Sequence, residues 1–392
     1  MEKVQTLRDY FKHNILAFQI TGIWMNPMDL TGTSWLIVVY SLAVNLLFIM
    51  SPQICHVIYM YKARNNVQAF AEEFHVSLPS LLVVFKSYSL LKNFGIIENL
   101  LNTMDMDMFQ AKNDYQMKQM KKVMGKWKKT YWLYASNAMS FVFFMLLSSL
   151  LERILNGTKV LPLVDCYPFD VHPSPTYEFI YIYQSFVICW LVIQNFNLDT
   201  FITGLITVAA VQCDILSNDL ENLIPERMRC EENQIICVMD KKLVECIKHH
   251  KEIHRFISDV AHCFSFNIFQ QFSCSVITFC TSMFEFSMTE PLSQEFYVII
   301  IYQCSVFFQL FIFCWAGTEL TEKSKKIPLS AYQSDWVNAS KSFRSSLLIF
   351  MQNAQKPFTI MALLFPVCVD MFLQIVRSSF SYYTVLISLS EE

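Results

Sequence analysis

Seven long apolar runs constrain this chain more than any other feature of its sequence. A helix needs about 20 mostly apolar residues to cross the hydrocarbon core of a bilayer. Hydrophobic residues make up 54% of the 392 residues and charged residues only 16%, below the roughly 25% charge of an average soluble domain. The sequence therefore predicts an all-α, polytopic membrane protein that forms one domain over residues 1–392. The predicted spans are residues 35–59, 78–94, 131–151, 177–210, 264–286, 296–316 and 358–389.

Lysine and arginine residues lie mainly on one side of these spans. The stretch KQMKKVMGKWKK, residues 118–129, directly precedes the third span, and the loops after the fourth and sixth spans are basic as well. Together with the N-terminal segment, this side carries 20 lysines and arginines, against 4 on the other. Because cytoplasmic loops are enriched in these residues, we expect a cytoplasmic N-terminus and an extracellular C-terminus. The sequon at Asn156 then lies outside, where it is a candidate for glycosylation.

The segment after the sixth span is amphipathic and predicts a cytoplasmic helix over residues 333–354. Apolar side chains such as Phe343 and Leu347 recur at helical spacing against polar ones such as Lys341. Pro357 disfavours a helical conformation at the preceding residue. The last helix is therefore predicted to be split into a cytoplasmic half before the proline and a membrane half after it.

No pattern in the chain indicates an enzyme, a cofactor or a nucleic acid partner. A net charge of -3 argues against nucleic acid binding. The sequence contains no nucleophile elbow, phosphate loop or H-E-x-x-H zinc motif. His250 and His254 are four residues apart on a predicted helix, with His249 beside them, but two histidines leave a metal site incomplete. A solvated or intersubunit helix face is the simpler interpretation, and we expect no enzyme activity, no cofactor and no metal.

The outer halves of the second to sixth spans contain apolar and aromatic residues at helical spacing. Each of them is, by itself, more typical of helix packing than of ligand contact. If they enclose a pocket, its ligand should be small, neutral and largely apolar, because Lys86 is the clear charged exception in this region. The candidate ligand-binding residues are Leu81, Val84, Phe85, Tyr88, Phe141, Phe144, Met145, Ser148, Tyr181, Gln184 and Ile188.

The C-terminal stretch SSFSYYTVLISLSEE alternates small hydroxyl residues with apolar ones. Val385 and Leu389 lie one turn apart on one helix face, with Ser388 beside them. Repeated around a symmetry axis, this face would close a pore by excluding water, and Glu391 and Glu392 would attract cations to its outer mouth. A plain lipid-facing helix end has the same composition, so composition alone leaves both interpretations open.

Two stretches of the chain resemble one family, the insect odorant receptors. One is LPLVDCYPFDVHPSPTYEFIYIYQ, before and within the fourth span, and the other covers residues 329–386. The orientation expected from the charges is also that of the family. The residues that match the family pattern in the second stretch are Tyr332, Trp336, Leu348, Met351, Pro357, Ala362, Ser381 and Tyr382.

The resemblance implies an odorant-gated, nonselective cation channel, assembled as a tetramer in the plasma membrane of olfactory sensory neurons. It implies an odorant pocket in the outer half of the second to sixth helices, and gate residues on the last helix that correspond to Val385 and Leu389. The loop after the fourth span, residues 212–262, is short compared with that of the family's shared co-receptor. We therefore expect an odorant-tuning subunit whose partners are the co-receptor, a small volatile odorant and the lipid bilayer.

Three other classes of membrane protein fit the sequence less well. Gustatory receptors often end their last helix with T-Y-x5-Q-F, whereas Ser381-Tyr382 is followed by no Gln-Phe pair. A G-protein-coupled receptor would have the opposite orientation, with D-R-Y after the third span and N-P-x-x-Y in the seventh, and the chain has neither. A transporter built from inverted repeats would have a matching pair of broken helices, which we do not find.

Overall fold

A computed structural model describes residues 6–24, 34–65, 67–163, 167, 169–223, 232–337 and 339–390. This part of the chain is almost entirely helical, and its one sheet is a two-stranded hairpin. In chain order the elements are η1 (Arg8–Phe11), α1 (Lys12–Ile20), α2 (Ser34–Asn45), the π-helical turn η2 (Leu46–Met50), α3 (Ser51–Ala63), α4 (Val67–Lys92), α5 (Phe94–Met104), η3 (Asp107–Phe109), α6 (Asp114–Asn156), α7 (Thr176–Glu221), α8 (Glu232–Met288), α9 (Gln294–Ser324), α10 (Lys326–Gln333), α11 (Lys341–Ala354), β1 (Met361–Ala362), β2 (Phe365–Pro366) and α12 (Val369–Ser390).

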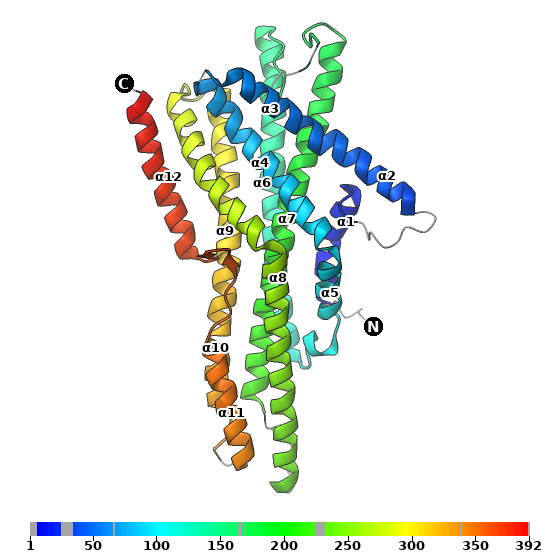
Figure 1. Ribbon diagram of the computed structural model, residues 1–392, viewed down its shortest axis with the longest axis vertical. Helices are drawn as coiled ribbons and strands as arrows, with labels where there is room; N and C mark the ends of the chain where they lie inside the picture. The colour runs from blue at the N-terminus through cyan, green and yellow to red at the C-terminus, as the bar shows by residue number, and fades with distance from the viewer. Residues whose placement is uncertain are drawn as a thin grey trace.

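Helices α6 to α9 form the centre of the molecule (Figure 1). On α7, almost every side chain from Phe196 to Leu216 is buried. Apart from polar residues such as Asn197, Asp199 and Gln212, which hydrogen-bond to other elements, the sequence there is apolar or small on all sides, as expected of a helix surrounded by protein. Gly204 lets the rings of Phe11 and Trp127 pack directly against the backbone of α7. A Cβ atom at this position would stand 2.7 Å from the ring of Phe11 and 2.8 Å from that of Trp127. The other helices therefore pack around α7.

The molecule has two distinct ends. At one end lie α10, α11 and the first turns of α8, and at the other lie the connection between α6 and α7 and the last turns of α12 (Figure 1). Lys112, just before α6, is 3.6 Å from Asp219 on α7 and 3.9 Å from Glu245 on α8. The basic start of α6 thus belongs to the α10–α11 end. The structure gathers at this end the basic segments around α6, α8 and α9 that the charge pattern predicts on one side.

Four helices in the described residues are long and apolar enough to cross a membrane. They cover Trp35–Ala63, Asp114–Asn156, Thr176–Glu221 and Phe296–Gln333. A fifth candidate is the pair α4–α5, bent by 70° after Lys92. The predicted spans on α8 and α12 are not among them, because Gln270 and Gln271 interrupt the apolar run of α8, and Asp370 and Arg377 that of α12.

Two predicted helix boundaries differ in the structure. The helix predicted over residues 333–354 begins at Lys341, because Ser340 caps it by accepting a hydrogen bond from the backbone N–H of Phe343 at 3.0 Å. The last helix, predicted to begin at residue 358, begins at Val369. The residues before it form the β1–β2 hairpin instead.

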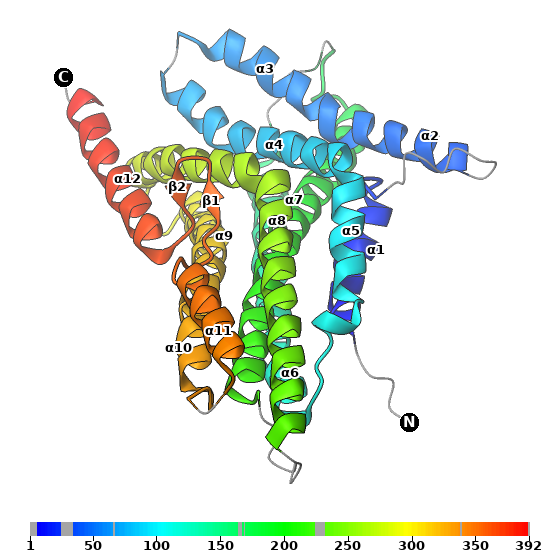
Figure 2. The ribbon, with the colours of Figure 1, turned by 60° about the horizontal axis from the view of Figure 1, so that its bottom comes forward.

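This hairpin connects the helices of the bundle to α12 (Figure 2). Ser265 on α8 donates a hydrogen bond to the carbonyl of Met361 at 2.7 Å. On α9, Gly317 lies directly against the segment that leaves the hairpin, since a Cβ atom there would stand 2.0 Å from the carbonyl oxygen of Val367. The start of α12 is therefore fixed against both α8 and α9.

We predict that Gly317→Ala destabilises this junction. The added methyl group must displace the backbone at Val367, and such overpacking costs about 1–3 kcal/mol. The matched control is Gly125→Ala on α6, where an added Cβ meets nothing within 4 Å. The thermal midpoint of the detergent-solubilised protein, followed by fluorescence-detected size exclusion, should fall for Gly317→Ala only. Equal midpoints for the two variants would contradict the tight packing at this junction.

Candidate ligand-binding site

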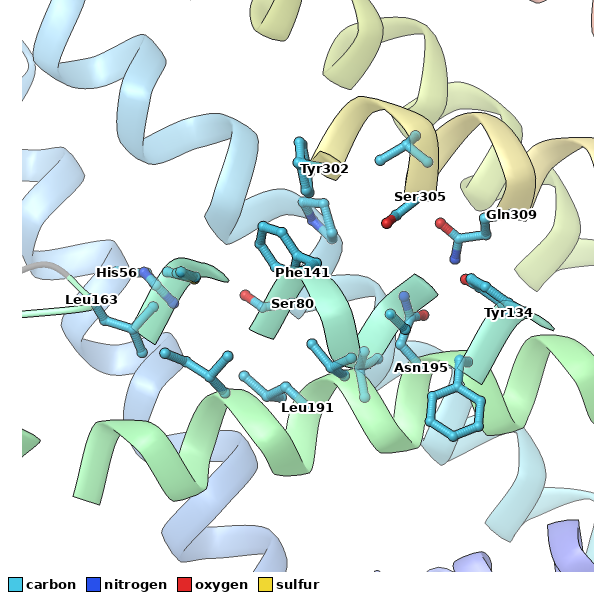
Figure 3. A pocket seen from close by; sticks show the side chains of 18 residues that line it. His56, Ser80, Tyr134, Phe141, Leu163, Leu191, Asn195, Tyr302, Ser305 and Gln309 are labelled. Atoms are coloured by element: carbon cyan, nitrogen blue, oxygen red, sulfur yellow. The ribbon is translucent and has the colours of Figure 1, made fainter. Parts of the chain in front are cut away.

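A cavity of about 150 Å³ lies between α4, α6, α7 and α9 (Figure 3). It lies in the half of the bundle away from α10 and α11, and most of its walls are apolar. The connection between α6 and α7 reaches it through Leu163, and α3 reaches it through His56. The lining residues are His56, Pro79, Ser80, Val83, Tyr134, Ala138, Phe141, Met145, Leu163, Ile188, Leu191, Val192, Asn195, Phe196, Tyr302, Ser305, Val306 and Gln309.

Helix α4 turns a different face to the cavity from the one predicted. Pro79, Ser80 and Val83 line it, and Lys86, one turn further along, is 1% exposed. The helix phase follows from Lys86, because a charge at this depth must point into the protein to find partners rather than into lipid. The predicted stripe therefore does not line the cavity: Leu81, Phe85 and Tyr88 are exposed, and Val84 is half-buried in a small separate cluster.

On α6 and α7 the prediction lies closer to the cavity. Phe141, Met145 and Ile188 line it. Phe144 does not, because it is 41% exposed on the outer face of α6. Ser148, one turn beyond Phe144, is half-buried and also lies outside the lining. One α6 stripe was predicted, but its members divide between the inner and outer faces of the helix.

The other predicted residues hold the outer end of the bundle together. Tyr181 donates a hydrogen bond to the carbonyl of Leu146 at 2.9 Å and so ties α7 to α6. Gln184 accepts a hydrogen bond from the backbone N–H of Leu163 at 2.9 Å, which positions the α6–α7 connection over the cavity. Asn156, the last residue of α6, is exposed at the same end. Tyr181 and Gln184 thus support the cavity without lining it.

One end of the cavity is polar, and sequence reasoning missed it. The polar side chains come from α6, α7 and α9, and no residue of α9 was predicted. Two opposite charges within apolar runs, Lys86 on α4 and Asp199 on α7, are the sequence signal that could have located this end, because neither charge is tolerated in lipid without a partner. The missed polar residues at this end are Tyr134, Asn195, Tyr302, Ser305 and Gln309, and the polar lining residues His56 and Ser80 elsewhere in the cavity were missed as well.

Behind this polar end lies a buried ion pair between α4 and α7. The Lys86 Nζ donates to Asp199 Oδ1 at 2.6 Å, to Gln271 Oε1 at 2.7 Å and to Asn195 Oδ1 at 3.0 Å. The other carboxylate oxygen of Asp199 accepts a hydrogen bond from Gln309 Nε2. Both charged side chains are at most 1% exposed. The network therefore joins four helices, α4, α7, α8 and α9, at a level where lipid offers no alternative partners.

The histidines of α8 serve in packing. His249 Nε2 lies 2.9 Å from Gln212 Oε1, and burial lowers the pKa of His249 to about 3, so this imidazole is neutral. The ring of His250 packs against Phe350 and Phe358. Within the residues that the structure describes, no three His, Cys, Asp or Glu side chains lie together in a way that could hold a metal ion.

The predicted gate residues lie on α12, away from the cavity. Val385 is 53% exposed and Ser388 is exposed as well, because α12 packs against α8 and α9 with its opposite face. The side chain of Leu389 and the whole of Glu391 and Glu392 lie outside the described part of the chain. The chain itself leaves this face of α12 uncovered.

The fold and the cavity define a class: a polytopic helical membrane protein with an apolar, ligand-sized cavity inside its bundle. The family model described as 7tm Odorant receptor matches residues 63–380. The chain therefore belongs to the insect odorant receptor family, and both the resemblance and the all-α polytopic fold expected from the sequence are confirmed. The relatives are receptors, in agreement with the expectation that the chain is not an enzyme.

The relatives are distant, and several of them extend over nearly the whole chain. Odorant receptor Or1 of Anopheles gambiae is 23% identical over 98% of this chain and 96% of its own length. Odorant receptor 46a, isoform B, of Drosophila melanogaster is 22% identical over 96% and 98%. The solved structure of the olfactory receptor OR5 from Machilis hrabei in complex with eugenol matches 98% of both chains with a TM-score of 0.85 at 20% identity. At this identity the structural match establishes the fold.

We predict that Lys86→Met destabilises the receptor strongly, because the Asp199 carboxylate is left buried without its cation. Removing one member of a buried ion pair costs about 3–5 kcal/mol. The double variant Lys86→Met/Asp199→Asn removes both charges and should recover most of this loss. Lys92→Met, which removes an exposed charge from the same helix, is the control. Thermal midpoints measured in detergent test the prediction, and a single variant as mild as Lys92→Met would refute the role of the pair.

Proposed function

We propose that this chain is an odorant-tuning subunit of an odorant-gated, nonselective cation channel that assembles with the family's co-receptor as a heterotetramer. The observation that carries the proposal is the apolar cavity enclosed by α4, α6, α7 and α9 in a member of the odorant receptor family. The receptor would act in the plasma membrane of olfactory sensory neurons, with the α6–α7 connection and the end of α12 outside the cell. The exposed Asn156 would then be available for glycosylation.

The size and chemistry of the cavity select a small, neutral, volatile ligand. An apolar cavity of about 150 Å³ accommodates a molecule of the size of benzene. Burying about 250 Å² of such a ligand contributes roughly 6 kcal/mol at about 25 cal/mol per Å². Association costs of several kcal/mol leave at most a few kcal/mol, which corresponds to an affinity in the millimolar range or weaker from apolar burial alone. Such an affinity suits a receptor that must release its odorant quickly.

The exposed face of α12 is suited to line a pore. Gln374, Ser378, Ser381 and Val385 follow one another at three- or four-residue spacing along this face, and all are exposed. Polar side chains facing lipid are costly, so the face is best accommodated beside water, around an axis shared with neighbouring subunits. Val385 then narrows the path of the ions through this pore. This is the role that the family resemblance implies for a gate residue at this position.

Helix α9 connects the cavity with α12. Val306 lines the cavity, and the next residue, Phe307, faces α12, where its ring lies 4.8 Å from that of Phe372. Phe311 contacts the same ring at 5.7 Å. A displacement of α9 by a ligand is therefore transmitted to the first turn of α12. The ligand opens the channel only if it binds the open arrangement more tightly than the closed one.

Phe141→Ala and Phe144→Ala form a matched pair that tests the cavity as the odorant site. Both remove a ring from α6, but Phe141 lines the cavity whereas Phe144 is on the outer face. In cells that express the chain with the co-receptor, Phe141→Ala should shift half-maximal odorant concentrations about tenfold or more, and Phe144→Ala should leave them in place. Whole-cell currents are recorded without intracellular GTP, so that a G-protein receptor would give no response. A transporter would show saturating uptake without channel currents.

A cysteine series tests the pore face of α12. Ser381→Cys and Val385→Cys should be modified by a charged, membrane-impermeant thiol reagent during odorant application, and the modification should reduce the current. Phe380 is the control, because it is exposed but lies about 140° around the helix from Val385, at about 100° per residue. Phe380→Cys and the unsubstituted receptor should not respond to the reagent. Equal modification of all three positions would exclude this face as the pore lining.

A further inference from the structure

Two amide groups at the polar end of the cavity each have one atom that makes no hydrogen bond with the described residues. Asn195 on α7 and Gln309 on α9 both line the cavity (Figure 3). Both are hydrogen-bonded to the Lys86–Asp199 pair behind the lining. The charges of this pair decide which atom of each amide faces the ligand. The polar end therefore has a defined donor and acceptor pattern.

The ammonium group of Lys86 fixes the orientation of Asn195. An ammonium has three N–H donors and no acceptor, so the amide must present its oxygen to it. The distance from Lys86 Nζ to Asn195 Oδ1 is 3.0 Å. The amide nitrogen of Asn195 is then left over, and it makes no hydrogen bond with any described residue. Asn195 thus offers the cavity an N–H donor.

The carboxylate of Asp199 fixes Gln309 in the opposite sense. An ionised carboxylate only accepts hydrogen bonds, so Gln309 must present its nitrogen, which donates to Asp199 Oδ2. The same nitrogen lies 3.3 Å from Gln271 Oε1. The Gln309 Oε1 has no donor among the residues placed by the structure. Gln309 thus offers the cavity an acceptor.

The remaining polar side chains of the lining already have partners. Tyr134 donates to Asp199 at 3.4 Å, and Ser305 hydrogen-bonds to Asn137 at 2.9 Å. Ser80 is bonded to Gln53. His56 is bonded to Glu73, and Tyr302 also has a partner. At the polar end of the cavity, the amide atoms without a hydrogen-bond partner among the described residues are therefore one donor, on α7, and one acceptor, on α9.

We infer that the cavity is built for a small volatile that carries a hydroxyl group, an alcohol or a phenol. The hydroxyl oxygen accepts from Asn195 Nδ2, and the hydroxyl proton is donated to Gln309 Oε1. A hydrocarbon of the same shape leaves both amide atoms unpaired, and an aldehyde, having no O–H, leaves Gln309 Oε1 unpaired. A site built to bond a hydroxyl rejects analogues that lack it, because its own buried polar atoms lose their partner. Lys86 and Asp199 act as positioning residues, because they orient the amides without reaching the ligand.

This inference rests on the proposed function, and one experiment separates the two. Currents are recorded from cells that express the full chain with the co-receptor, using sets matched in shape and in number of non-hydrogen atoms: benzyl alcohol, benzaldehyde and ethylbenzene, and 1-hexanol, hexanal and heptane. The alcohol should activate at an about tenfold or more lower concentration than the hydrocarbon of its set, with the aldehyde between them. Equal potency within the sets that activate would overturn the inference and leave the proposed channel intact. Absence of current for every compound, with the receptor at the cell surface, would overturn both.

Variants of the two amides test the assignment at the level of single atoms. Asn195→Leu and Gln309→Met keep the approximate side-chain volume and remove the cavity-facing donor or acceptor. Each should bring the ratio of hydrocarbon to alcohol half-maximal concentrations close to one. Phe144→Ala, outside the cavity, should keep the ratio of the unsubstituted receptor. If one amide variant does not reach the cell surface, the other is sufficient for the test. A variant that reaches the cell surface and keeps the hydrocarbon-to-alcohol ratio of the unsubstituted receptor would contradict the inference.

Discussion

The buried ion pair between Lys86 and Asp199 is the interaction on which the arrangement of this receptor depends. Both side chains are at most 1% exposed. Neither charge has a tolerable alternative in the membrane, so the pair and its amide partners fix the rotation of α4 and the depth of α7, α8 and α9 relative to one another. Apolar packing alone specifies helix phase weakly, because any face of such a helix buries nearly as well as another. The same pair forms the back of the cavity, so one interaction sets both the register of the bundle and the chemistry of the site.

The parts of the fold that follow from apolar length and charge were predictable, and those that follow from helix phase were not. The long runs located α6, α7 and α9, and the basic segments identified the end at which α10 and α11 lie. The stripe on α4 was assigned to the wrong face, because Leu81 and Phe85 are as apolar as Val83, and only the partner of Lys86 distinguishes the two faces. That partner is on α7, more than 100 residues away, and one sequence does not pair them. The late start of α12 was missed because the hairpin before it is held by contacts to α8 and α9.

Helix α9 has two functions because its two faces pack against different neighbours. One face contributes Val306 and Gln309 to the cavity, and the other contributes Phe307 and Phe311 to the contact with α12. A helix that is rigid over this short distance cannot move on one face without moving on the other. The coupling that we propose between the ligand and α12 therefore needs no extended chain of side chains, since the cavity and the start of α12 lie on two faces of one helix. Gly317 lets the α9 backbone touch the segment before α12, which adds a second contact along the same helix.

The two walls of the cavity differ in how firmly the protein holds them. On the α7 side nearly every residue is buried, whereas α3, which packs along α4, and α2 before it expose most of their apolar side chains. A ligand that fills the cavity therefore presses between a fixed helix and helices with few protein neighbours. A ligand makes the most contacts in the arrangement that encloses it best. Only the difference in its affinity for the open and closed arrangements shifts their populations. The polar end determines which arrangement the inferred hydroxyl ligand favours. A ligand bonded to both Asn195 on α7 and Gln309 on α9 binds most tightly to the arrangement in which the two amides face it together.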